Sequence, residues 1–446
     1  MNNSATTNLA ITNRVRISQI LVLALIAFAG LLTACGNDNV LPAEQEPEYA
    51  MQVALPEPPI NILPVLPASG RITILTEPLG WGGVGWESYS ANWLREIHGG
   101  EKIYHSTTWG GSRSSMELTA ESIINDPEIR VVIINSARLG TNWFVSKIRE
   151  QRSDIFIVYI DYESDGYCDY PYISQTFSEG VAMADLILNI DMFEMYRNLP
   201  LQAQLLGAET LVFFYISGWD DDSSWAESWY YYDEREAMRV ASAEIGLRFV
   251  EVARSPWCIG CNSDFFMYKQ ENIPMLIDRY GRDIAFVGLG GPRMFAKSVR
   301  EGVIYLPSYE RSFPTSLALG MQEYALVSAG FITTNTEELS DKNNLPFIID
   351  EIRTALDEHG MLGRVSTWPV SASTLLTYAA VEYGIKWING YAPQNEIDIE
   401  ILQQIMVDFI AKYSGEYGLG VNLAERVHDG NVYANYVLVF MEFMIY

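Results

Sequence analysis

Short apolar runs rich in β-branched residues alternate with longer amphipathic segments along most of this chain. In the first half the runs cover 71–76, 102–106, 131–135, 155–160 and 184–188, and the segments between them cover 86–97, 112–125, 141–151 and 177–182. Val131 to Ile134 reads Val-Val-Ile-Ile without a polar break, which is typical of a strand that helices cover on both faces. The alternation therefore predicts an α/β fold with a doubly wound parallel sheet.

The same alternation returns in the second half of the chain. We expect strands at 211–217, 248–252, 284–289 and 303–307, and helices at 225–245, 264–280, 292–301 and 314–329. No exact internal repeat is visible, but the repeated element order predicts two doubly wound parallel-sheet lobes with a cleft and a hinge.

The sequence after residue 370 predicts helices at 371–389 and 396–413 and a last strand at 433–443 that is mostly buried on both faces. The helix after residue 370 is expected to return to the first lobe. We therefore expect an N-terminal lobe of residues 71–190, completed by 371–446, and a C-terminal lobe of residues 191–370.

Residues 1–34 have the pattern of an export signal. Two arginines precede an uncharged apolar run over 17–32, which is too short for a comfortable membrane span. The run ends in Leu-Thr-Ala-Cys, the Leu-small-small-Cys pattern of a bacterial lipoprotein cleavage site. The alternative is an uncleaved anchor helix. Cleavage would leave an acylated Cys35, so we expect an extracytoplasmic protein, periplasmic or at the cell surface, that is lipid-anchored to a cell membrane.

Residues 35–70 are rich in Pro, Glu, Asn and Gln and lack any period, so we expect an extended tether. Export would expose the remaining cysteines, Cys168, Cys258 and Cys261, to an oxidising compartment. The Cys258-x-x-Cys261 spacing fits a redox pair, half a metal site or a small structural disulfide. The chain has only four histidines and no second cysteine pair, which favours the disulfide.

Charge argues against a nucleic-acid partner. The chain carries 29 Lys and Arg against 56 Asp and Glu, a formal charge of −27, and no basic run offsets it. Hydrophobic residues make up 49%, which is enough to bury a large core.

Aromatic side chains crowd the loops that follow the predicted strands. Ligands of open α/β sheets bind beyond the carboxyl ends of the strands. Flat rings beside fixed polar groups suit a sugar, a nucleoside or another polar ligand with a ring, although such rings also fill protein cores. The candidate ligand-binding residues are Trp81, Trp86, Thr108, Trp109, Ser136, Arg138, Asp161, Tyr162, Trp219, Asp220, Arg293, Tyr309 and Trp368.

Signatures of catalysis, cofactors and metals are weak. The Gly-rich segments 80–85 and 288–291 lack the Lys-Ser/Thr ending of a phosphate-binding loop, and no Gly-x-Ser-x-Gly elbow supports a hydrolytic triad. The acidic run 220–222 lacks the spacing of a calcium loop. We therefore predict no catalytic residue, no cofactor and no metal site.

The order of export signal, Pro-rich tether and two α/β lobes resembles a type I periplasmic binding protein. More narrowly, segments 127–140, 147–161, 184–189 and 363–370 resemble an uncharacterised bacterial lipoprotein family, a domain of unknown function with the same binding-protein-like fold. The resemblance covers about residues 71 to 446, and Ser-Thr-Trp-Pro at 366–369 is its most distinctive motif. The many Trp and Tyr after the strands and the Cys258-x-x-Cys261 segment depart from the family pattern. The resemblance implies the fold and the location of this protein.

We therefore expect a solute-binding lipoprotein that closes its lobes around a small polar, ring-containing solute and passes it to an ABC-type permease or a membrane sensor. The alternative is a surface lipoprotein of the same fold that contacts proteins or other macromolecules through its acidic face, without solute capture.

Overall fold

In the computed structural model, the unit that holds the described residues spans 63–446. The structure describes residues 70–76, 86–107, 113–135, 137, 140–161, 177–216, 229–254, 272–287, 292–306, 326–327, 329–335, 338–340, 344–414 and 419–446. The predicted signal peptide and, except for Gly70, the predicted tether lie outside them.

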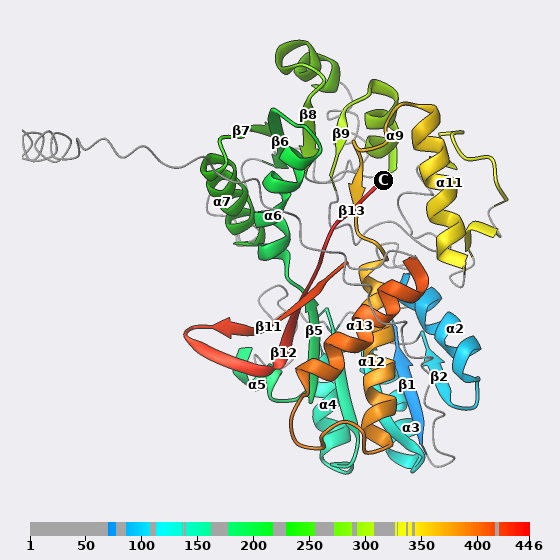
Figure 1. Cartoon of the computed structure of the whole chain (residues 1–446). Helices are drawn as coiled ribbons and strands as arrows, with labels where there is room; N and C mark the ends of the chain where they lie inside the picture. Colours follow the sequence, from blue (N-terminus) through cyan, green and yellow to red (C-terminus); the bar gives the residue numbers. More distant parts are fainter. Residues whose placement is uncertain are drawn as a thin grey trace, which may run out of the picture. The chain divides into compact units, whose positions relative to one another are not determined.

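A seven-stranded sheet is built mainly from the first half of the chain, with its strands in the order β11-β12-β5-β4-β3-β1-β2 (Figure 1). Neighbouring strands run parallel except for β11, which pairs antiparallel with β12 at the edge. The sheet therefore recruits its last two strands from the end of the chain. Its strands are β1 (Arg71–Leu75), β2 (Ile103–Ser106), β3 (Ile129–Asn135), β4 (Phe156–Ile160), β5 (Leu186–Ile190), β11 (Val421–His428) and β12 (Asn431–Met441).

Helices cover both faces of this first sheet. Successive strand residues point to opposite faces, so Val131 faces α2, α12 and α13 whereas Val132 faces α3 and α4. The short α5 contacts β12. The helices are α2 (Trp86–His98), α3 (Arg113–Asn125), α4 (Thr141–Arg149), α5 (Phe177–Val181), α12 (Ala372–Ile388) and α13 (Ile399–Ser414).

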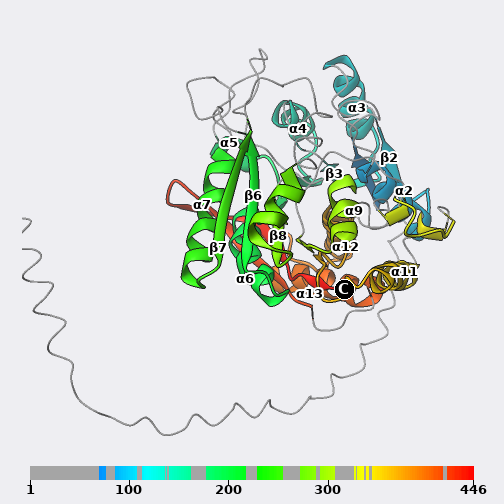
Figure 2. The same ribbon diagram turned by 90° about the horizontal axis from the view of Figure 1, so that it is seen from above.

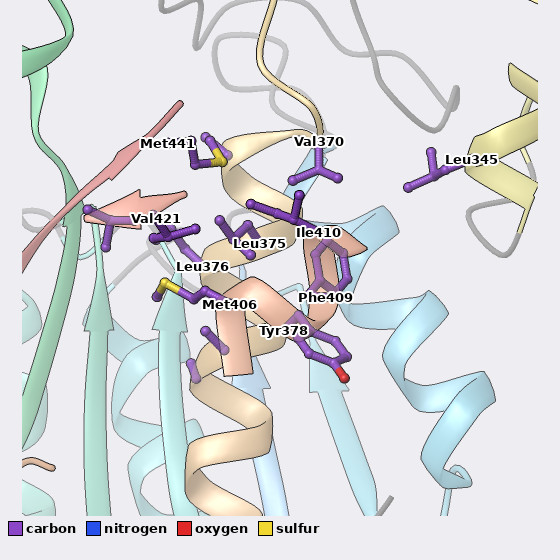
Figure 3. Close-up of a cluster of buried hydrophobic side chains, with 14 of the residues drawn as sticks. Leu345, Val370, Leu375, Leu376, Tyr378, Met406, Phe409, Ile410, Val421 and Met441 are labelled. Atoms are coloured by element: carbon purple, nitrogen blue, oxygen red, sulfur yellow. The ribbon is translucent and has the colours of Figure 1, made fainter. Parts of the chain in front are cut away.

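The larger core lies under α12 and α13. Figure 3 shows Leu376 and Tyr378 of α12 gathered with Met406 and Phe409 of α13. Tyr378 and Phe409 have their ring centroids 4.5 Å apart. This core also holds buried side chains of α11 such as Ile348, so it continues beyond the first sheet.

A four-stranded parallel sheet forms in the middle of the chain, in the order β7-β6-β8-β9. Helices α6 and α7 pack on one face, and a helix at residues 272–280 packs on the other. Figure 2 shows α6 and α7 beside β6 and β7. The strands are β6 (Thr210–Ile216), β7 (Arg248–Arg254), β8 (Ile284–Val287) and β9 (Ile304–Tyr305). The labelled helices of this part are α6 (Met192–Leu205), α7 (Trp229–Glu244), α9 (Pro292–Glu301), the 3-10 helix η1 (Glu338–Ser340) and α11 (Leu345–Glu358).

Both sheets repeat one strand order. Counted along the chain, the first sheet reads 2-1-3-4-5 from β2 to β5. The second sheet reads 2-1-3-4 from β7 to β9. A parallel bridge from Tyr305 to Val365 then brings β10 (Ser366–Thr367) beside β9 as a fifth strand. Strand β13 (Met444–Ile445) borders β10 in the antiparallel direction, whereas β12 borders β5 in the parallel direction. The two sheets are thus two copies of one doubly wound arrangement.

These elements confirm the predicted α/β class. Helix α9 has the predicted bounds, and most described strands lie within two residues of their predictions. Three details were wrong. Strand β5 begins at Leu186 rather than Ala184, β12 is buried mainly from Tyr436 onward, and α6, α11, β10, β11 and β13 were not expected. Much of the predicted helices 264–280 and 314–329 lies outside the described residues.

Candidate functional site

The carboxyl ends of the parallel strands in the first sheet bring polar residues to one edge. Thr76 follows β1, Ser106 ends β2 and Asn135 ends β3. Asp161 follows β4, and Asp191 follows β5. Parallel strands end on the same side of a sheet, so these five residues share one edge, where ligands of such sheets bind.

A histidine relay spans the β1 and β2 end of this edge. Thr76 Oγ1 lies 2.9 Å from His105 Nε2, and His105 Nδ1 lies 3.0 Å from Asn92 Oδ1 on α2. Burial lowers the pKa of His105, and the charge of Arg95 lowers it further. The neutral ring carries one proton, so Nδ1 donates to Asn92 and Nε2 accepts from the Thr76 hydroxyl. The relay therefore fixes the orientation of the ring at the edge.

A second polar layer fixes the first turns of α12 over the same edge. Asn135 Nδ2 donates to Thr377 Oγ1 at 3.1 Å, and Thr377 Oγ1 donates to the Ser373 carbonyl at 2.7 Å. Ser90 of α2 and Thr374 of α12 join their hydroxyls at 3.0 Å. Asn135, Thr377 and Ser90 have no exposed surface, so this layer positions α12 and does not itself face solvent.

Asp161 stands out by its backbone. Its φ is 58°, in the left-handed region that most side chains avoid, and its N–H donates to the Leu188 carbonyl at 3.0 Å. The side chain is partly exposed. Residues held in sparsely populated backbone regions cluster at functional sites, so this conformation marks Asp161 as a candidate site residue.

Trp368 lies where the chain leaves the second sheet for α12. The indole is partly buried and packs against both the large core under α12 and the core between α6 and β6. Thr367 Oγ1 donates to the Trp368 carbonyl at 3.1 Å. Trp368 and Pro369 thus lie on the segment that leads from β10 to α12. The predicted ligand contact of Trp368 stays a prediction.

Three described segments connect the two sheets. Asp191 separates β5 from α6, residues 368–371 separate β10 from α12, and residues 442–443 separate β12 from β13. The Asp191 N–H donates to the Val439 carbonyl at 2.8 Å, so the first and third crossings are tied together. Such short crossings are the hinge elements of two-lobed binding proteins.

Most of the predicted ligand-binding residues lie outside the described part of the chain. Asp161 and Trp368 are described fully, and Trp86 and Arg293 are placed by their backbones at the start of α2 and in α9. The residues outside are Trp81, Thr108, Trp109, Ser136, Arg138, Tyr162, Trp219, Asp220 and Tyr309, together with Cys35, Cys168, Cys258 and Cys261.

Sequence reasoning missed His105, Asn92 and Asp191 as members of this region. His105 lies one residue before the end of β2 and could have been selected by that position. Asp191 accepts from the Glu194 N–H at 2.9 Å and begins α6. An Asp just before a helix with Glu three residues later is a recognised start signal.

Metal and membrane features can be assessed only for the described residues. Among them, no group of three or more His, Cys, Asp or Glu side chains is arranged to hold a metal ion. None of the described helices combines the length and apolarity needed to cross a membrane.

A family model described as "Protein of unknown function (DUF3798)" matches residues 87–366. No curated protein matches the chain. A crystal structure described as a transcriptional regulator from Clostridium difficile 630 has a TM-score of 0.63 at 16% identity, covering 84% of this chain and 99% of that one. This likeness shows the fold alone.

Two further solved structures are less similar to this chain. A sugar ABC transporter from Actinomyces odontolyticus ATCC 17982 gives a TM-score of 0.42 at 12% identity, covering 72% of this chain and 84% of that one. A structure described as a branched-chain amino acid ABC transporter from Rhodospirillum rubrum gives 0.37 at 11% identity, covering 76% and 89%.

Proposed function

Because the chain belongs to the family described as a protein of unknown function (DUF3798), we propose its function from its own geometry. We propose that it captures a small polar solute between two α/β lobes and releases it unchanged. The two sheets and their three crossings form a type I periplasmic-binding-protein-like fold. Fold does not fix function, so the proposal depends on the site.

The observation that carries the proposal is the polar edge of the first sheet beside the crossings. Asp161 and His105 are partly exposed there, above a fully buried polar layer that holds α12 in place. Asp191 and Trp368 connect this edge to the second sheet. A ligand held by groups from both lobes would favour a closed arrangement, because each lobe adds contacts only on closure.

The proposed solute is polar and contains a ring. Asp161 supplies a carboxylate that can accept hydrogen bonds from hydroxyl or amino groups. The remaining contacts are proposed from sequence, with Trp81 and Trp109 from the first lobe and Trp219 from the second as stacking faces. Sugars and nucleosides offer this combination of ring face and polar rim.

Location and partners complete the proposal. We propose that the mature chain begins at acylated Cys35, that residues 35–70 tether it, and that an ABC-type permease or a membrane sensor receives the solute. The lobes are proposed as residues 71–190 with 371–446 and residues 191–370. A disulfide joining Cys258 and Cys261 is also proposed.

A thermal-shift screen tests the function directly. The probes are single pentoses, hexoses, ribonucleosides and amino acids, each added to a purified chain that begins at Gly36 and so lacks the lipid anchor. A bound solute must raise the midpoint of unfolding by mass action, and the rise should grow with solute concentration. Asp161→Asn should reduce the shift without lowering the midpoint of the free protein. A screen in which no probe shifts the midpoint favours the macromolecular-contact alternative.

A further inference from the structure

Helix α11 is fixed to the second sheet at its C-terminal end. From there the chain passes to β10, which lies beside β9 through the bridge between Tyr305 and Val365. Between α11 and β10, the Arg364 carbonyl accepts from the Tyr305 N–H at 3.0 Å, and the Arg364 guanidinium donates to the Asp283 carboxylate at 3.1 Å. Asp283 directly precedes β8. This end of α11 therefore moves with the second sheet.

Helix α13 is fixed to the first sheet. Gln403 Nε2 donates to the Val421 carbonyl of β11 at 2.6 Å. The Phe409 ring centroid lies 6.1 Å from that of Trp93 on α2 and 4.5 Å from that of Tyr378 on α12. Both of these helices cover the first sheet, so α13 moves with it.

The two helices contact each other. Leu345 at the start of α11 is 2% exposed, Ile410 near the end of α13 is 1% exposed, and both belong to one core. Figure 3 shows the Leu345 side chain pointing from α11 toward Ile410 and Val370. The same core holds Tyr305 of β9 and Ile74 of β1. Apolar packing is therefore continuous from one sheet to the other, alongside the three chain crossings.

A rotation between the sheets must alter the contact between α11 and α13, because each helix is fixed to a different sheet. The crossings can absorb a rotation by changes of backbone torsion angles. The packed side chains cannot, because separating them exposes apolar surface to water. Helices also pack in a few preferred ways, ridges into grooves, so the contact favours discrete arrangements over a continuous range.

We propose that the contact between α11 and α13 is a non-covalent latch that holds the two lobes in the arrangement of this structure. The lobes leave that arrangement only when the contact breaks or shifts to another packing. The latch rests on the lobe motion of the proposed function, but it needs no bound solute, so the two proposals can fail separately.

Single-molecule energy transfer between the lobes tests the latch. Dyes on non-natural amino acids at Leu118 of α3 and Val240 of α7, both exposed, avoid the native cysteines. The protein is the chain that begins at Gly36, measured without solute. The measured quantity is the fraction of folded molecules outside the main arrangement of the lobes.

The variants truncate the latch from each side. They are Leu345→Ala, Ile410→Ala and the double variant, with Ile410→Val as a milder change that removes one methyl group. Leu276→Ala is the matched control, because Leu276 is a buried helical leucine whose core contains only residues around the second sheet.

The expected result is a shared effect of the two latch residues. Each Ala variant should raise the fraction outside the main arrangement at least about threefold, because it removes part of the packing between α11 and α13. The double variant should raise it by less than the product of the single effects, because both side chains act on one contact. Leu276→Ala should lower the midpoint of thermal unfolding and leave the fraction unchanged.

Other results separate the two proposals. An unchanged fraction in both Ala variants, or an equal rise in Leu276→Ala, would overturn the latch, and a probe solute that still raises the midpoint of unfolding would leave solute capture standing. A raised fraction together with a screen in which no probe raises the midpoint would support the latch and count against solute capture. If the Ala variants do not fold, Ile410→Val decides, with a smaller rise expected and no rise contradicting the latch.

Discussion

His98, the last residue of α2, places Nε2 at 3.2 Å from Oε1 of Glu382 on α12, and both side chains are more than nine-tenths buried. The distance fits an ion pair, yet the alignment is too poor for a hydrogen bond. The pair joins two helices that cover the same face of the first sheet. Since burying two ionisable groups costs free energy, we expect the pair to fix the relative position of these helices more than to stabilise the fold.

Removing one partner of this pair should destabilise the protein. Glu382→Ala is expected to lower the free energy of unfolding by about 3 kcal/mol, because His98 then stays buried without its partner. Replacing both residues by Leu should cost less than the sum of the two single Leu variants. Urea denaturation measures both effects, with exposed Glu400→Ala as the control. Additive costs would show that the two groups are not coupled.

Substitutions of Asp161 distinguish the effect of its strained backbone from the effect of its proposed ligand contact. Asp161→Gly should keep or raise stability, because Gly adopts a positive φ freely, whereas Asp161→Ala should be about 1 kcal/mol less stable than the Gly variant. Asp161→Asn tolerates the conformation but lacks the charge, so solute affinity should fall while the fold is kept. Denaturation and titration of a screened solute measure these effects. Equal stability of the Gly and Ala variants would contradict the strain.

The lowered pKa of His105 leads us to expect that the stability of the protein depends on pH. Its pKa is lowered from the ordinary 6.5 by burial and by Arg95, so the folded state favours the neutral ring. The unfolded chain takes up the proton first on acidification, and the contribution of His105 to stability is lost as the pH falls below about 6.5. In His105→Gln this part of the decline should disappear. Parallel stability curves for the two proteins between pH 7.5 and about pH 5 would contradict it.

The proposed stacking residues can be tested once a solute is identified. Trp109→Ala and Trp219→Ala should each weaken binding by about 1–3 kcal/mol, as expected for loss of an aromatic face. Tyr391→Ala is the matched control, because Tyr391 is 69% exposed and lies at the end of α12 away from the polar edge. Calorimetric titration measures the affinities. If both Trp variants bind as tightly as wild type, the ligand lies elsewhere.

The proposed anchor has its own test. Cys35→Ser should release the protein from the membrane fraction, because the acylated residue is lost. Fractionation and immunoblotting of cells measure the distribution. A variant that stays with the membrane as firmly as wild type would favour an uncleaved anchor helix instead.

The strands were predictable because the buried ones are continuous apolar runs, as at Val131 to Ile134. β11 was missed because it is an edge strand: its sequence mixes Asn422 and Glu425 with apolar residues, and much of it is exposed. α6 was missed because Pro200 interrupts the sequence pattern, although the helix continues through it. Local pattern thus identifies buried strands better than edge strands and helices that contain Pro.

The site was less predictable for a different reason. The position of Asp161 follows from strand order alone, so the sequence sufficed to select it. The contact of Asn135 with Thr377 joins residues 242 apart in sequence, and the contact of His105 with Asn92 requires α2 to fold back over β1 and β2. Such partners are decided by tertiary packing, which a local pattern does not contain.

Strand β12 is synthesised long after β5, the strand with which it pairs, and this affects how the chain folds during synthesis. β5 gains its second neighbour only when residues 436–439 exist, about 250 residues after Ile190. At about 5–20 residues per second, the edge of β5 stays bare for roughly 10–50 s of synthesis. Likewise, β10 has no antiparallel neighbour until β13 has been synthesised. A chain that stops before residue 431 therefore leaves two unpaired strand edges, so a premature stop yields an aggregation-prone fragment rather than a smaller folded protein.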